Sequence, residues 1–192
     1  MTNILVIEGA SGVGKSTLVR ELLQENPDWI TPPTFNWPRE RNLSTEISGN
    51  SVSDYSILAT SYANQNSVVV SDRGFLGHWV YQAYKYGYQE SWLFDFKGCM
   101  ERLSTTARGE VSARVTTEQH AHMHTPFRPK IVIVLLHIDE YALRQQRLRS
   151  GNKYPYEEAN LYYRMAMELG RESKQAEIMF MRGPVRAKDL MV

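Results

Sequence analysis

The sequence predicts a three-layer α/β fold in which helices flank both sides of a central parallel sheet. Three observations support this prediction. Short apolar runs alternate with amphipathic segments from one end of the 192-residue chain to the other. Two of the runs are nearly continuous and rich in β-branched residues, which is typical of strands buried on both faces. The sequence contains no internal repeats, low-complexity tracts or Gly/Ser linkers, so we expect one domain over residues 1–192.

The first half of the chain starts with the strand-like run NILVIE. It is followed by KSTLVRELLQE, in which Leu18, Leu22 and Leu23 lie on one helical face. The segment WITPPTF carries a second short strand, which Pro32 and Pro33 bring to an end. DYSILATSYANQ is expected to form a helix and SVVVSD a buried strand. This order of elements begins a βα pattern.

The second half continues the same pattern. KIVIVLLHID is a strong strand, and EYALRQQRLRS after it is a helix. After the break SGNKYP come the long helix YEEANLYYRMAMELGRESKQ and a last short strand, AEIMFM. Between the two halves, residues 89–125 form a helix-rich stretch to which the pattern assigns no role.

Composition excludes several classes of protein. The 22 Lys and Arg nearly balance the 21 Asp and Glu, so the overall charge does not indicate a protein that wraps nucleic acid. The single cysteine, Cys99, cannot form an internal disulfide, which fits a reducing compartment and excludes a cysteine-based zinc site. No segment has the length of a membrane span or the pattern of a signal peptide, so a soluble cytoplasmic protein is expected.

A phosphate-binding motif follows the first predicted strand. Residues 9–16, GASGVGKS, match G-x-x-x-x-G-K-[ST] at every fixed position, between a strand and a helix. Glycines let backbone N–H groups turn toward phosphate oxygens, and the helix adds the positive end of its dipole. Lys15 would reach the β- and γ-phosphates, and the Ser16 hydroxyl would bind Mg²⁺. The predicted nucleotide-binding residues are Gly9, Ala10, Ser11, Gly12, Val13, Gly14, Lys15, Ser16 and Thr17.

Four segments, in the expected order along the chain, resemble the thymidylate kinase and deoxynucleoside kinase group. They are IEGASGVGKST, VVVSDRG with the following GHWVYQAY, the long segment IDEYALRQQRLRSGNKYPYEEANLYYRM, and the tail MFMRGPV. The resemblance implies a P-loop kinase fold with ATP and Mg²⁺ as cofactors, a tail loop that cups the adenine ring, and, as in thymidylate kinases, a homodimer.

Asp72 and Arg73 are candidates for catalysis. They close a strand at the edge of the sheet where α/β proteins bind ligands. The resemblance gives Asp72 a role beside magnesium or at a sugar hydroxyl, so Asp72 and Ser16 form the predicted metal site. Arg73 is expected to contact the phosphate of the acceptor or the transferred group. The alternative for Asp72 is a simple cap at the end of the strand.

Three arginines predict a short lid at roughly residues 144–155. Arg144, Arg147 and Arg149 lie on or just after one helix, with Gly151 as a candidate hinge. A mobile arginine lid closes over phosphates and excludes water, so we assign Arg147 to catalysis and Arg144 and Arg149 to the nucleotide. The alternative is a solvated helix face.

The loop after the second predicted strand, TPPTFNWPRERN, departs from both kinase groups. It lacks the glutamate that deoxynucleoside kinases carry there as general base, and also the REPGG-type loop of thymidylate kinases. Arg39 and Arg41 are candidates for binding an acceptor phosphate, and Glu40 is the nearest candidate base. Two arginines around one glutamate favour a monophosphate acceptor.

Aromatic residues are frequent after the second and third predicted strands. Phe35 and Phe75 are the first candidates for stacking on a nucleobase. For the others, packing in the core is the alternative reading. They are Trp37, Trp79, Tyr81 and Tyr84.

Three hypotheses follow. The leading one is a kinase that transfers the γ-phosphate of ATP to a deoxynucleoside monophosphate, thymidylate or a related pyrimidine. The second keeps this chemistry with a hydroxyl acceptor, on a free deoxynucleoside or on a modified base or end in DNA. A DNA acceptor calls for a basic groove, for which the candidates are Arg102, Arg108, Arg114 and Arg128. The third is a regulatory NTPase, which needs no arginine lid.

Overall fold

A computed structural model describes residues 2–33, 43–77, 80, 129–150, 157–172 and 176–190. Within these residues the strands form one parallel sheet in the order β2-β1-β3-β4. The strands are β1 (Ile4–Glu8), β2 (Val69–Asp72), β3 (Ile131–His137) and β4 (Ala176–Arg182). The predicted parallel sheet is therefore confirmed.

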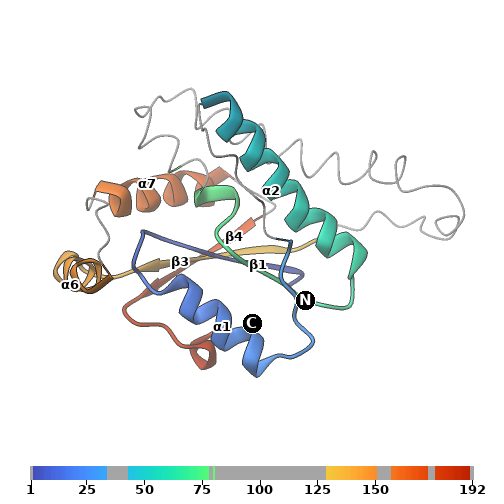
Figure 1. Cartoon of the computed structure of the whole chain (residues 1–192), viewed down its shortest axis with the longest axis horizontal. Helices are drawn as coiled ribbons and strands as arrows, with labels where there is room; N and C mark the ends of the chain where they lie inside the picture. Colours follow the sequence, from blue (N-terminus) through green and yellow to red (C-terminus); the bar gives the residue numbers. More distant parts are fainter. Residues whose placement is uncertain are drawn as a thin grey trace, which may run out of the picture.

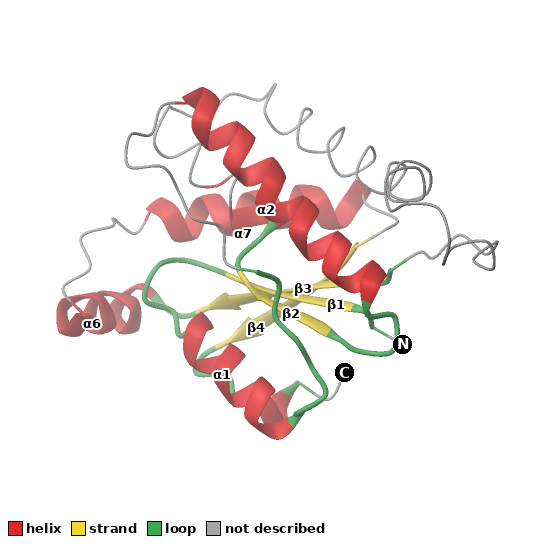
Figure 2. Cartoon of the chain, turned by 45° about the vertical axis from the view of Figure 1, so that its right-hand side comes forward, coloured by secondary structure: helices red, strands yellow, loops and turns green. Residues whose placement is uncertain are grey.

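Helices cover both faces of the sheet (Figure 1). Helix α1 lies on one face, whereas α2 and α7 lie on the other, and Figure 2 shows the same three layers from a second direction. Helix α6 lies at the carboxyl end of β3. Their bounds are α1 Lys15–Glu25, α2 Leu43–Ala63, α6 Glu140–Ser150 and α7 Glu157–Glu172, and a short 3₁₀ turn, η1, spans Ala187–Asp189. In the described part of the chain, no helix is both long and apolar enough to cross a membrane.

The central strand β1 is buried along its whole length, which explains why its sequence is an unbroken apolar run. Its successive side chains point to opposite faces of the sheet. Leu5 packs in the cluster that contains Leu18 of α1, and Val6 packs in the cluster that contains Ile57 of α2. The two faces of β1 thus belong to two different apolar clusters.

Two elements differ from the prediction. In place of a strand at residues 29–35, the described residues show a single parallel bridge between Ile30 and Val69, just before Pro32 and Pro33. The prolines lack the N–H that a longer ladder needs. Helix α2 begins at Leu43, well before the predicted helix at residues 54–65. Its first half is rich in Ser, Gly and Asn, which have low helix propensity and hide it from pattern analysis.

The topology places loops from different parts of the chain at one edge. The chain continues from β1 to β2 on one side and reaches β3 and β4 on the other. Loops at the carboxyl ends of the strands therefore diverge beside β1, which is where open α/β sheets bind ligands. Residues 9–16 and the residues after β2 both lie at this edge.

Candidate phosphate-binding site

The phosphate loop, residues 9–16, turns sharply between β1 and α1. Gly9, Gly12 and Gly14 all have positive φ angles, of 135°, 85° and 104°. At Gly9 a side chain is excluded for a second reason, because a Cβ atom would lie 2.5 Å from the carbonyl oxygen of Leu136. The glycines of the motif thus have the conformational role that their spacing predicts.

Lys15 begins α1 and is buried against its own loop. Its Nζ donates hydrogen bonds to the carbonyl oxygens of Gly9, at 2.7 Å, and Ala10, at 2.8 Å. Burial and then the positive charge of Arg73 lower the pKa of Lys15 from 10.5 to about 8. The carboxylates of Asp72, Glu8 and Glu158 oppose this shift. Lys15 is therefore a desolvated cation, which binds phosphate strongly.

The two predicted metal ligands lie together. The Ser16 hydroxyl donates a hydrogen bond to Oδ2 of Asp72. A hydroxyl and a carboxylate are hard oxygen donors that fit Mg²⁺, which is usually held by one or two protein ligands together with phosphate oxygens and water. Within the described ranges, no group of three or more His, Cys, Asp and Glu residues could hold a metal ion.

The backbone that follows Arg73 is held in place by the buried carboxylate of Glu8, on the neighbouring strand β1. Arg73 has a positive φ of 74°, in the left-handed region that is strained for residues other than glycine. Next to it, Oε1 of Glu8 accepts hydrogen bonds from the backbone N–H groups of Gly74, Leu76 and Gly77, at 2.9–3.1 Å. The Ser71 hydroxyl donates to the Arg73 carbonyl at 2.6 Å. These contacts fix the loop that presents Arg73.

The arginines of α6 lie in two different environments. Arg147 is buried, with Nε donating to the Ser11 carbonyl at 3.0 Å and one terminal nitrogen 2.8 Å from Oε2 of Glu158. Arg144 is exposed and pairs with Glu140 one turn away. The structure thus places Arg147 inside the protein, where it holds the phosphate loop, instead of on a solvent-facing lid. Residues 151–155 of the predicted lid lie outside the described residues.

Glu158 is a site residue that sequence analysis did not identify. It is fully buried in the first turn of α7, and its Oε1 accepts a hydrogen bond from the backbone N–H of Ser11 at 3.0 Å. A signal was present in the sequence, because Glu158 shares a helical face with Tyr162 and Met165. An acidic residue on an apolar stripe indicates a buried carboxylate with a dedicated partner.

Part of the phosphate loop and the end of β2 line an open pocket of about 480 Å³ at the carboxyl edge of the sheet. Its lining includes the phosphate loop, the start of α1 and the residues that end β2; the members are Ser11, Gly12, Gly14, Lys15, Ser16, Thr17, Asp72 and Arg73. Two cations, one carboxylate and a helix N terminus converge here. Such an arrangement can bind a phosphate chain together with a divalent cation.

One predicted base contact, Phe75, lies away from the pocket. Phe75 is fully buried in the apolar layer beneath α2, so its ring packs in the core and does not line the pocket. Its position shortly after the end of β2 does not by itself distinguish stacking on a nucleobase from packing in the core. Four other predicted site residues lie outside the described residues: Phe35, Arg39, Glu40 and Arg41. Arg149 lies in α6, but its side chain is not among those described.

The fold is supported by comparison with solved structures. Neither a protein-family model nor a curated protein matches the sequence. Among solved structures, thymidylate kinase from Ehrlichia chaffeensis matches with a TM-score of 0.53 at 14% identity, over 98% of this chain and 91% of that one. Thymidylate kinase from Candida albicans gives 0.53 at 13%, over 96% and 85%. Deoxyadenosine kinase from M. mycoides gives 0.50 at 11%, over 96% and 93%. The chain therefore has the P-loop kinase fold that its motifs predict.

Proposed function

We propose that this protein is an ATP- and Mg²⁺-dependent kinase that transfers the γ-phosphate to a deoxynucleoside monophosphate, most simply thymidylate. The observation that carries the proposal is the pocket at the phosphate loop, where Lys15, Arg73 and the Ser16–Asp72 pair converge. The fold shared with two thymidylate kinases supports the same substrate class.

The geometry suits phosphoryl transfer, because this reaction depends on positioning and on neutralising charge on the phosphate oxygens. In the proposed complex, the phosphate loop and the start of α1 bind the β- and γ-phosphates, and Lys15 exchanges its two carbonyl partners for phosphate oxygens. Arg73, on the facing loop, neutralises charge on the acceptor or on the transferred group. Ser16 and Asp72 would hold Mg²⁺, which when bound draws charge from the phosphate oxygens.

A hydroxyl acceptor is the second candidate, because deoxyadenosine kinase from M. mycoides shares the fold. That protein was solved with dCMP and dCDP as bound products. The two candidates differ at Arg39, Glu40 and Arg41. If the acceptor is a monophosphate, Arg39→Ala raises its KM; if it is a hydroxyl, Glu40→Gln lowers kcat.

A transfer assay with γ-labelled ATP and Mg²⁺ tests the proposal. The acceptors are the deoxynucleoside monophosphates, the free deoxynucleosides, and DNA with and without hydroxymethylated bases. We expect label on thymidylate. Label only on nucleosides or DNA supports the second candidate, and release of inorganic phosphate alone would instead indicate a regulatory NTPase.

Two variants link activity to the pocket. Lys15→Ala removes the desolvated cation and is expected to abolish transfer, and Asp72→Asn is expected to raise the Mg²⁺ concentration needed for half-maximal rate. Far-UV circular dichroism serves as the folding control. Full activity in Lys15→Ala would contradict the proposal.

A further inference from the structure

Ser11, in the middle of the phosphate loop, is bound by side chains from three other parts of the chain. Its N–H donates to Glu158 of α7 at 3.0 Å, and its carbonyl accepts from Nε of Arg147 of α6 at 3.0 Å. Its hydroxyl oxygen lies 3.3 Å from a terminal nitrogen of Arg73. Both backbone groups of one loop residue are therefore held by the two helices beside the site.

The contacts of Glu158 and Arg147 with Ser11 form a closed ring, because the two side chains also pair with each other at 2.8 Å. Both side chains are nearly or fully buried, at 6% exposure for Arg147 and 0% for Glu158. A buried ion pair is seldom the most stable way to fill a volume, since desolvation offsets its Coulombic attraction. The stability of the fold alone thus gives no reason for an ion pair at this position.

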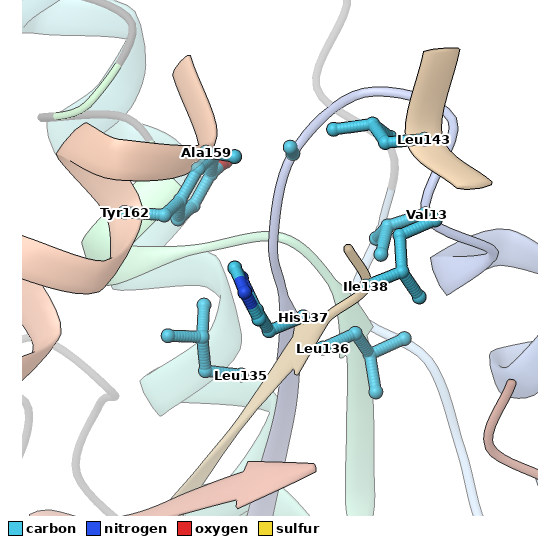
Figure 3. A pocket seen from close by; sticks show the side chains of 9 residues that line it. Val13, Leu135, Leu136, His137, Ile138, Leu143, Ala159 and Tyr162 are labelled. Carbon is cyan, nitrogen blue, oxygen red and sulfur yellow. The ribbon is translucent and has the colours of Figure 1, made fainter. Parts of the chain in front are cut away.

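Apolar packing brings the same helices against the loop. Figure 3 shows Ala159 and Tyr162 of α7 on one side, Leu143 of α6 on the other, and Val13 of the phosphate loop near Leu143 and Ile138. The remaining cavity is only about 10 Å³, room for one water molecule at most. Beside it, the stem of Arg147 passes close to Gly12, where a Cβ atom would lie 3.3 Å from Cγ of Arg147. The loop therefore has little freedom to move independently of α6 and α7.

We propose that Glu158 and Arg147 are positioning residues for phosphoryl transfer. They hold Ser11 so that the phosphate loop has its binding shape before nucleotide arrives, and Arg147 acts through Glu158 and Ser11 without touching the transferred phosphate. This inference rests on the proposed kinase function, and it differs from the role of a lid arginine, which neutralises charge only in the transition state.

Conservative variants test this inference. Glu158→Gln keeps a carbonyl acceptor but removes the charge that pairs with Arg147. Arg147→Lys keeps the positive charge at position 147, but a lysine cannot donate to the Ser11 carbonyl and to Glu158 with the fork geometry of a guanidinium group. The matched control is the exposed ion pair of Lys130 and Glu177, at 2.9 Å compared with 2.8 Å for Arg147 and Glu158. It lies at the amino ends of β3 and β4, away from the phosphate loop, and is tested as Glu177→Gln.

Three measurements are made on each variant: hydrogen exchange of the Ser11 amide, the Kd of Mg·ADP, and kcat and KM for ATP. For Glu158→Gln and Arg147→Lys we expect faster Ser11 exchange and an increase of about tenfold in both Kd and KM, with a smaller change in kcat. In the double variant, the Kd and KM should increase no more than in the more strongly affected single variant, because both substitutions break the same ring. Glu177→Gln should match the wild type in all three measurements.

Two results would overturn the inference. In one, kcat falls in Arg147→Lys while the Kd of Mg·ADP and Ser11 exchange stay at the wild-type values, which would indicate direct contact with the transferred phosphate. In the other, both variants keep wild-type exchange and affinity. If Glu158→Gln does not fold, Arg147→Lys alone decides between these outcomes. A wild type that transfers phosphate to no acceptor refutes the kinase proposal separately, and Ser11 exchange still tests whether the ring holds the loop.

Discussion

Arg144 and Arg147 lie three residues apart on α6, yet they are in opposite environments. Arg147 is buried, pairs with a buried carboxylate and binds the phosphate loop, whereas Arg144 is 69% exposed and pairs with Glu140 on its own helix. The difference follows from position on the helix, because Arg147 lies one turn after the buried Leu143 and so shares its face. Position relative to the apolar stripe, more than the number of arginines, thus decides which arginine belongs to the site.

The largest test of this comparison is Arg147→Met. Removing the guanidinium group leaves the buried carboxylate of Glu158 without the positive charge that compensates it, so we expect a loss of about 3–5 kcal/mol in the free energy of unfolding. Urea denaturation measures the loss. The double variant Arg147→Met/Glu158→Leu should lose less than Arg147→Met alone, since no buried charge is left. An Arg147→Met variant as stable as the wild type would show that the pair is not buried in solution.

Lys15 extends the comparison to a buried cation whose direct partners are carbonyl oxygens. Its pKa is about 8 in the folded protein and 10.5 ordinarily. Below pH 8 Lys15 is therefore charged in both the folded and the unfolded protein, and the free-energy cost of burying its charge fully opposes folding. Between these values the unfolded state holds a proton that the folded state has released. The free energy of unfolding, relative to Lys15→Met, should therefore rise by about 1.4 kcal/mol per pH unit above pH 8. Urea denaturation from pH 7 to 9.5 measures this, and a constant difference between the two proteins would contradict it.

Arg73, which lines the pocket, differs from both arginines of α6 in having a strained backbone. Comparing Arg73→Gly with Arg73→Ala isolates the strain, because both variants lack the guanidinium group and only glycine adopts a φ of 74° freely. We expect the glycine variant to be more stable than the alanine variant by about 1 kcal/mol in thermal denaturation. Both should lose phosphoryl transfer. Equal stability would mean that the positive φ is not maintained in solution.

Arg144→Ala completes the series with the smallest effect. An exposed ion pair between residues four apart on a helix contributes about 0.3–0.5 kcal/mol. We expect a loss in that range, reduced further by 1 M salt, in the same urea experiment. A loss comparable to that of Arg147→Met would remove the distinction between the two arginines.

The sequence predicted those parts of the molecule that depend on local pattern. The unbroken apolar run of β1, the helix beginning at Lys15 and the phosphate loop between them all follow from spacing and glycine placement. The helix at residues 140–150 was predicted with the same bounds. Each of these features is determined by residues that are neighbours in the chain.

Features that depend on contacts between distant residues were not predicted. The bond between Ser11 and Glu158 joins positions 147 residues apart, and no local pattern specifies it. Phe75 was interpreted as a base contact because aromatic residues near a predicted cleft can serve in either role, and only the packing of α2 against the sheet distinguishes them. A closer inspection of the helical faces would have indicated burial of Arg147 and Glu158, though not their shared partner.

The ring around Ser11 also limits how this chain can evolve. Replacing Glu158 first leaves a buried guanidinium without its counter-charge, and replacing Arg147 first leaves a buried carboxylate in the same situation. Either order therefore passes through a variant of lowered stability, so each residue constrains which substitutions are tolerated at the other. Related sequences should therefore contain both residues or neither, and a library that randomises the two positions together should recover functional pairs that single-site libraries miss.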